Sequence, residues 1–152
     1  MDTFPNNRPI LAASLSVQQE ILKYGTEESG ELFTSCGGIP RLLLVLRKYY
    51  KVMQLLELCA HNLRYVVSFC GKHKVRGICQ ELIAVPKNTR ALLSGVDCLL
   101  RVIKEHPLER ELQATCGATL LCLVALNPEM TKYIGGEKNV SNLANFMKVY
   151  LY

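Results

Sequence analysis

The sequence predicts an all-helical chain built from stacked repeats, and three observations carry this prediction. Hydrophobic residues make up 49% of the 152 residues, whereas aromatic residues make up only 7% and tryptophan is absent. A composition dominated by Leu, Val, Ile and Ala favours helix packing over a β-sandwich. Apolar residues recur at helical spacing, and a short pattern repeats along the chain. The length suits one globular domain or one short repeat array.

The repeated pattern starts with a glycine and ends with two adjacent leucines. Residues 38–43 (Gly-Ile-Pro-Arg-Leu-Leu) have the same form as residues 95–100 (Gly-Val-Asp-Cys-Leu-Leu), and Gly136 with residues 140–144 gives a weaker third copy. The equivalent leucines Leu42, Leu99 and Leu143 are separated by 57 and 44 residues. The second offset lies inside the roughly 40–47 residue period of HEAT and armadillo arrays.

Each copy predicts a short amphipathic helix, and a longer apolar helix follows each of the first two copies. The short helices are expected over 42–50, 99–103 and 143–150, and the long ones over 55–67 and 112–126. A glycine upstream of each short helix can end the preceding helix by adopting positive φ, and Pro40 suits a first turn. Residues 127–129 (Asn-Pro-Glu) predict the start of a small helix that ends at Ile134.

The spacing of the first two units is irregular. About 13 surplus residues separate them, and they fall near 70–87. Residues 71–77 are typical of a basic connection, and 78–85 of an extra or elongated helix. We expect residues 1–12 to be irregular and helical packing to begin at Ala13.

Residues 112–136 resemble the third helix of an armadillo repeat running into the first helix and terminal glycine of the next repeat. Residues 36–43 are similar to the start of the second helix of that repeat. The likeness covers about residues 30–150. It implies that 13–152 form an armadillo-like right-handed α-superhelix, a short α-solenoid with two fairly complete repeats and partial flanking units. HEAT-like or generic α-superhelical packing is the alternative.

The resemblance also predicts an uncovered C-terminal end. The sequence ends at Tyr152 after a helix of the second type, without the third helix that would cover it. An apolar face left open there would allow self-association or continuation into a longer solenoid.

The net charge of +5 is concentrated in the middle of the chain. Residues 1–40 carry a net −3, residues 41–90 carry +8 and residues 91–152 carry zero. Cationic side chains that share a face attract anionic partners, although the same excess can serve as a solvated surface that keeps a leucine-rich chain in solution.

The residues give no support to catalysis, a metal site or a cofactor site. No histidine or cysteine spacing suits zinc, no G-x-S-x-G nucleophile is present, and the paired glycines make no phosphate-binding loop. We therefore expect that the protein is not an enzyme.

The cysteines indicate the compartment. Their number is odd, seven, and they include no C-x-x-C pair, which predicts reduced thiols in the cytoplasm or nucleus. Neither a secretion signal nor a membrane-spanning run is present, so we expect a soluble protein.

Partner binding is the function that the resemblance implies, because third helices of armadillo proteins line a concave groove. The residues selected for such a surface are Lys51, His61, Asn62, Arg64 and Tyr65, on or beside the first long helix. Asn62 is expected to grip a peptide backbone, Tyr65 to supply a rigid contact, and the two cations to meet carboxylates. A surface asparagine without a partner and a tyrosine packed between units are the alternatives.

The basic cluster Lys72, Lys74 and Arg76 raises nucleic acid as a second class of partner. The cluster is short and matches no helix-turn-helix, RRM or KH pattern, which disfavours nucleic acid. The sequence thus predicts a non-catalytic interaction module, an adaptor, scaffold or assembly factor, that binds protein segments, acidic ones among them. A nucleic-acid-associated basic repeat protein and a chaperone-like solenoid stay open as alternatives.

Overall fold

The computed structural model describes residues 7–69, 72–84, 94–136, 140–141 and 144, with residues 72–76 and 126 described by their backbone alone. Within these residues the fold is all-helical, which confirms the predicted class, and no strand occurs. The helices are α1 (Arg8–Lys23), α2 (Glu27–Ser35), α3 (Gly38–Lys48), α4 (Met53–Phe69), α5 (Lys72–Ile83), α6 (Gly95–Glu105), α7 (Arg110–Leu126) and α8 (Pro128–Ile134).

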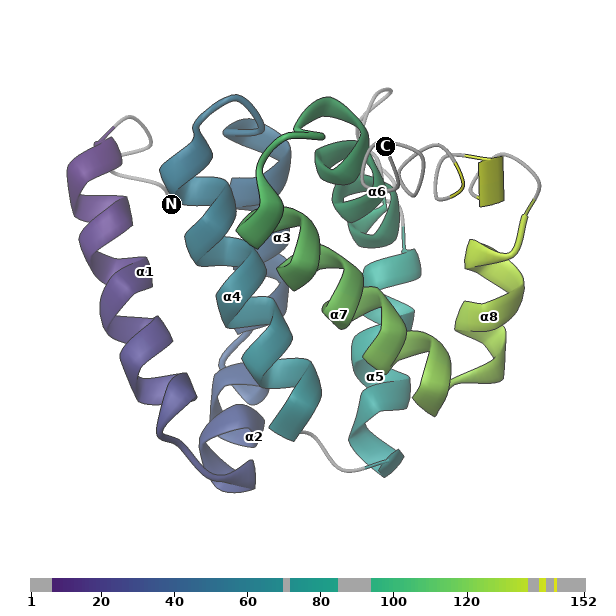
Figure 1. The fold of residues 1–152 in the computed structure, drawn as a ribbon. Coiled ribbons are helices and arrows are strands. Elements are labelled where there is room, and N and C mark those ends of the chain that lie inside the picture. Colours follow the sequence, from purple (N-terminus) through teal and green to yellow (C-terminus); the bar gives the residue numbers. More distant parts are fainter. Residues whose placement is uncertain (1–6, 70–71, 85–93, 137–139, 142–143, 145–152) are drawn as a thin grey trace.

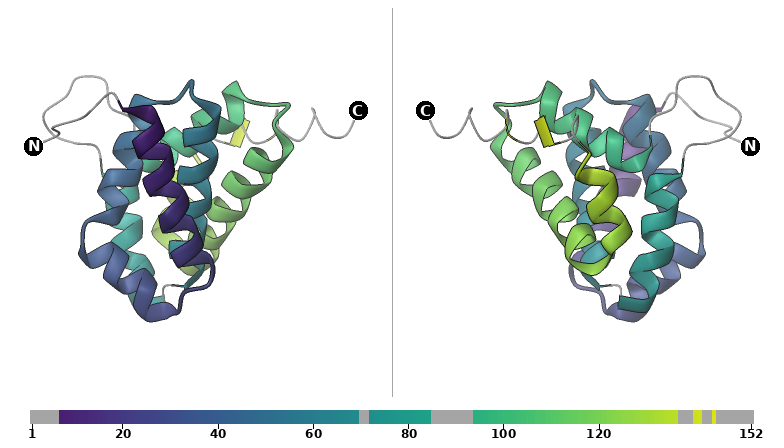
Figure 2. Two further views of the ribbon diagram at one scale, coloured as in Figure 1. Left: turned by 90° about the vertical axis from the view of Figure 1, so that its left-hand side faces the viewer. Right: turned by 90° about the vertical axis from the view of Figure 1, so that its right-hand side faces the viewer.

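The three longest helices, α1, α4 and α7, lie side by side in one layer. They contain 16, 17 and 17 residues, and α4 packs against α1 on one side and α7 on the other. All three run in the same direction (Figure 1). Helix α3 packs on α4 and helix α6 packs on α7, behind this layer, and α2, α5 and α8 complete the stack (Figure 2). The turns from α3 to α4 and from α6 to α7 consequently lie at the same edge of the molecule (Figure 1).

Helix α4 is buried on most of its circumference because it has packing neighbours on several sides. The apolar stripe predicted from the sequence is at most 1% exposed at every position: Leu55, Leu56, Cys59, Leu63, Val66 and Val67. Burying an aliphatic side chain of this size contributes about 1.5–3 kcal/mol. What α4 leaves at the surface is a narrow strip that includes Gln54, Arg64 and Ser68.

Helix ends follow the sequence signals in two places and depart from them in one. Gly37 has φ +74°, a left-handed conformation that glycine tolerates, between α2 and α3. Asn127 caps α8 by accepting a hydrogen bond from the backbone N–H of Glu129 at 2.9 Å. Gly95, in contrast, does not end a helix: it is the first residue of α6, where Ser94 is the N-cap. A Cβ at Gly95 would lie 2.7 Å from methyl groups of Leu43 and Leu82, so glycine permits close packing there.

Two boundaries differ from the sequence prediction. Helix α1 begins at Arg8, so residues 8–12, which were expected to be irregular, are helical, with Pro9 in the first turn, where its missing N–H costs little. Residues 72–77, expected to form a basic connection, belong to α5. Gly77 is the single strong helix breaker there, and one glycine costs a helix only about 1 kcal/mol. The short helix predicted over 143–150 and the uncovered C-terminal end lie outside the described residues, apart from residue 144.

Candidate functional site

Cationic side chains occur where α3 and α6 end: two lie over the ring of Tyr50, and Lys48 lies over the ring of Tyr49. We call this set the basic surface; its members are Arg47, Lys48, Lys51, Arg101 and Lys104, together with Tyr50. The guanidinium carbon of Arg101 lies 4.3 Å from the centre of the Tyr50 ring, and Nζ of Lys51 lies 5.5 Å from it. Lys104 is one turn beyond Arg101 on the exposed side of α6.

Packing between successive helix pairs assembles this surface. The backbone carbonyl of Tyr50, after α3, lies 3.2 Å from Nε2 of His106, directly after α6, which ties the two turns together. Burial raises the pKa of the Cys98 thiol on α6, and the positive charges of Arg47 and Arg101 oppose this rise. Both guanidinium groups are therefore close to Cys98, where α3 packs against α6.

Helix dipoles explain only part of this charge. Arg47, Lys48 and Lys104 occupy the last turns of their helices, where a cation gains about 0.3–1 kcal/mol from the carbonyl end. Lys51 follows α3, and Arg101 is in the middle of α6, so the dipole accounts for neither. A surface that holds these extra cations carries a positive potential suited to an anionic partner.

Among the described residues, α6 carries two carboxylates beside the basic surface, Asp97 and Glu105. Asp97 lies one turn before Arg101, and its Oδ2 accepts a hydrogen bond from the Tyr133 hydroxyl at 2.9 Å. Glu105 is exposed at the end of α6. The Nε of Arg101 is buried and has no hydrogen-bond partner among the described residues. Among these described residues, the cations outnumber the carboxylates.

A second feature is a row of rings along α4. His61 and Tyr65 stack with their centroids 6.4 Å apart, and Tyr65 and Phe69 stack at 6.5 Å. Nε2 of His61 lies 3.4 Å from a carboxylate oxygen of Glu111 on α7. Arg64 is exposed beside this row. Three of the predicted partner-binding residues, His61, Arg64 and Tyr65, therefore lie together on the outer side of α4.

Asn62 does not lie on that surface, which corrects the role expected for it. Its side chain is 0% exposed, and its Nδ2 donates a hydrogen bond to the carbonyl oxygen of Leu15 on α1 at 3.1 Å. Helix α1 packs against α4 and covers this position, a contact between distant segments that was not predicted from the sequence. Asn62 thus joins two helices instead of presenting its amide to a peptide.

Lys51 is separated from the other predicted residues. It precedes α4, whereas Arg64 is in the last third of the helix, 11 residues after Met53. At about 1.5 Å per residue, this places the two cations roughly 16 Å or more apart along the axis. Lys51 belongs to the basic surface, so the predicted site divides into two surfaces and a core residue.

The predicted basic cluster lies on α5, as far as its backbone is described. Lys72, Lys74 and Arg76 all fall within this helix, and their side chains lie outside the described part of the chain. Nothing in the structure therefore adds them to the basic surface.

The described residues contain neither a metal-binding cluster nor a membrane-spanning helix. These residues contain no group of three or more His, Cys, Asp or Glu side chains that could hold a metal ion. No helix among them has the length and apolarity needed to cross a membrane. Every cysteine that the structure describes is a free thiol.

Comparisons with known proteins add no assignment. No family model matches the chain, and neither a curated protein nor a solved structure matches it.

Sequence reasoning missed most of the basic surface because its members come from segments of different charge. Arg47 and Lys48 belong to the basic middle of the chain, whereas Arg101 and Lys104 lie in the segment with zero net charge. The repeat offset of 57 residues carried the missing signal. It places Lys104 at the position of Arg47, so the ends of both short helices could have been compared for charge.

Proposed function

We propose that this chain is a non-catalytic protein-interaction module whose basic surface binds an acidic segment of a partner protein. The observation that supports this function is the set of cations at the ends of α3 and α6, two of which, Lys51 and Arg101, lie within 5.5 Å of the centre of the Tyr50 ring. Arginine can hold a carboxylate with two hydrogen bonds, and lysine acts as a mobile point charge. The tyrosine adds a rigid contact of low conformational entropy.

We further propose that the helices form an armadillo-like right-handed superhelix. The order short, short, long recurs in α2, α3, α4 and in α5, α6, α7, and the long helices share a layer with α1. Such a stack presents equivalent positions of successive units side by side. The ends of α3 and α6 are equivalent in this sense, which supports a surface shared by two units. The free thiols support a reducing compartment, the cytoplasm or the nucleus.

Charge reversal with a matched control tests the binding function. Lys51→Glu with Lys104→Glu changes two exposed members of the basic surface. Lys23→Glu with Arg64→Glu makes the same change in net charge at exposed positions on α1 and α4. The probe is a fluorescein-labelled peptide of ten glutamates, followed by fluorescence anisotropy across a salt series.

We expect the first double variant to weaken peptide binding about tenfold or more, because two attractions become repulsions. The control is expected to change it by less than about threefold, since long-range effects are screened beyond roughly 10 Å at 0.1 M salt. Equal weakening by both variants would show dependence on net charge alone and contradict the proposed surface. Tighter binding of duplex DNA or single-stranded RNA, with a steep salt slope, would favour the nucleic-acid alternative.

A further inference from the structure

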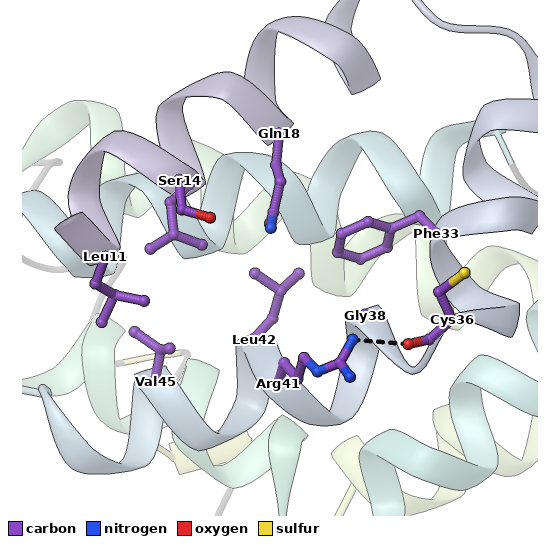
Figure 3. Close-up of a pocket in the computed structure, with 10 residues that line it drawn as sticks. Leu11, Ser14, Gln18, Phe33, Cys36, Gly38, Arg41, Leu42 and Val45 are labelled. Atoms are coloured by element: carbon purple, nitrogen blue, oxygen red, sulfur yellow. Dashed lines mark hydrogen bonds between the residues drawn. The ribbon is translucent and has the colours of Figure 1, made fainter. Parts of the chain in front are cut away.

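A pocket of about 320 Å³ opens between α1, α2 and α3. Its walls are mainly apolar, with a few polar groups that face the same space (Figure 3). The lining residues are Leu11, Ser14, Leu15 and Gln18 of α1, Phe33 of α2, Cys36 after it, and Gly38, Arg41, Leu42 and Val45 of α3. At about 30 Å³ for each water in the liquid, this volume corresponds to roughly ten water-sized groups.

One wall of the pocket is built around a glycine. The Phe33 ring packs directly on Gly38, where a Cβ would overlap the ring. Leu15 and Leu42 are at most 3% exposed and form an apolar floor. The pocket is therefore already formed, and an apolar group that enters it meets side chains held by the core.

Arg41 gives the pocket a positive edge. Its Nη1 donates a hydrogen bond to the carbonyl oxygen of Cys36 at 2.8 Å, which holds the guanidinium beside the opening (Figure 3). None of the described residues that line the pocket is acidic. The pocket is thus complementary to an apolar group that is attached to a negatively charged one.

The exposed side of α3 connects this pocket to the basic surface. Arg41, Leu44 and Lys48 are exposed and spaced three and four residues apart, so they lie along one face of the helix. Seven residues of helix span about 10 Å, which is the reach of about three residues of extended peptide. A peptide on this face would pass from the pocket to Lys48 within a few residues.

We propose that the pocket receives a bulky apolar side chain, such as leucine, of the acidic partner segment, with that segment lying along α3. A carboxylate next to the apolar residue then meets Arg41, and one about three residues further along meets Lys48. This inference rests on the proposed function and specifies the partner: an acidic peptide with one apolar anchor.

Two labelled peptides test the pocket. One contains leucine among glutamates, and the other has alanine in place of that leucine. The protein variants are Ser14→Phe, which places a ring in the pocket from the exposed side of α1, and Ser14→Ala, which removes the same hydroxyl without filling the space. Circular dichroism and thermal melting check that both variants keep the fold.

We expect wild type and Ser14→Ala to bind the leucine peptide about tenfold more tightly than the alanine peptide, because the extra apolar surface is buried. Ser14→Phe should bring the affinities for the leucine peptide and the alanine peptide within about twofold of each other. Arg41→Gln should weaken the binding of both peptides.

The proposed anchor is overturned if wild type binds the two peptides with equal affinity. It is also overturned if Ser14→Phe still binds the leucine peptide about tenfold more tightly than the alanine peptide. Either result leaves the proposed function standing. Failure of both peptides to bind wild type overturns the proposed function and this inference with it.

Discussion

Asn62 offers the sharpest test of the packing, because its side chain was expected at a binding surface and lies in the core. Asn62→Ala removes the hydrogen bond to the Leu15 carbonyl, whose net contribution is about 0.5–1.5 kcal/mol, and leaves a small cavity. Two effects limit the loss. Leu15 lies inside α1 and keeps the helical hydrogen bond of its carbonyl, and Oδ1 of Asn62 has no partner among the described residues, so its removal costs nothing. We expect Asn62→Ala to lower the free energy of unfolding by about 1–2 kcal/mol.

Asn62→Asp is expected to cost more than the alanine change. It keeps the volume of the side chain but places a negative charge at a position that is 0% exposed, 3.1 Å or so from a carbonyl oxygen. A buried charge without a partner typically costs about 3–5 kcal/mol. The order of stability should therefore be wild type, then Asn62→Ala, then Asn62→Asp.

Urea denaturation followed by circular dichroism measures these differences as shifts of the midpoint at constant m-value. Gln54→Ala, at an exposed position on the same helix, serves as the control and should change stability by less than about 0.5 kcal/mol. If both Asn62 variants were as stable as the control, Asn62 would be at the surface, and the packing of α1 on α4 would be refuted.

Two further predictions concern the core. Leu120→Ala, at a residue that is 5% exposed on α7, should lower stability by about 2–5 kcal/mol through the cavity it leaves, and a thermal melt showing an unchanged Tm would contradict this. Burial raises the pKa of Cys116 to about 12, so its thiol stays protonated near pH 8 and iodoacetamide should modify it at least about 100-fold more slowly than the exposed Cys36. Peptide mass spectrometry measures both rates, and the difference should disappear in denaturant; equal rates in the native protein would refute the burial.

Helical periodicity predicted part of the burial pattern of α4 and missed another part. The spacing of Leu55, Leu56 and Leu63 identified the buried stripe of α4, because helical geometry fixes which residues share a face. The same geometry put Asn62 next to that stripe, but it could not show whether a neighbouring helix covered the position. That depended on α1, whose first turn was assigned to an irregular segment.

The sequence by itself determined the all-helical class, the core stripes, and several helix boundaries, such as the start of α8 at Pro128. These features depend on residues close together in the chain, whose propensities, caps and periodicity act locally. Only the tertiary structure decided that Lys51 and Arg101 both lie over the Tyr50 ring and that Asn62 belongs to the core. The physical reason is that both arrangements join residues about 50 positions apart, and their proximity depends on how whole helices pack.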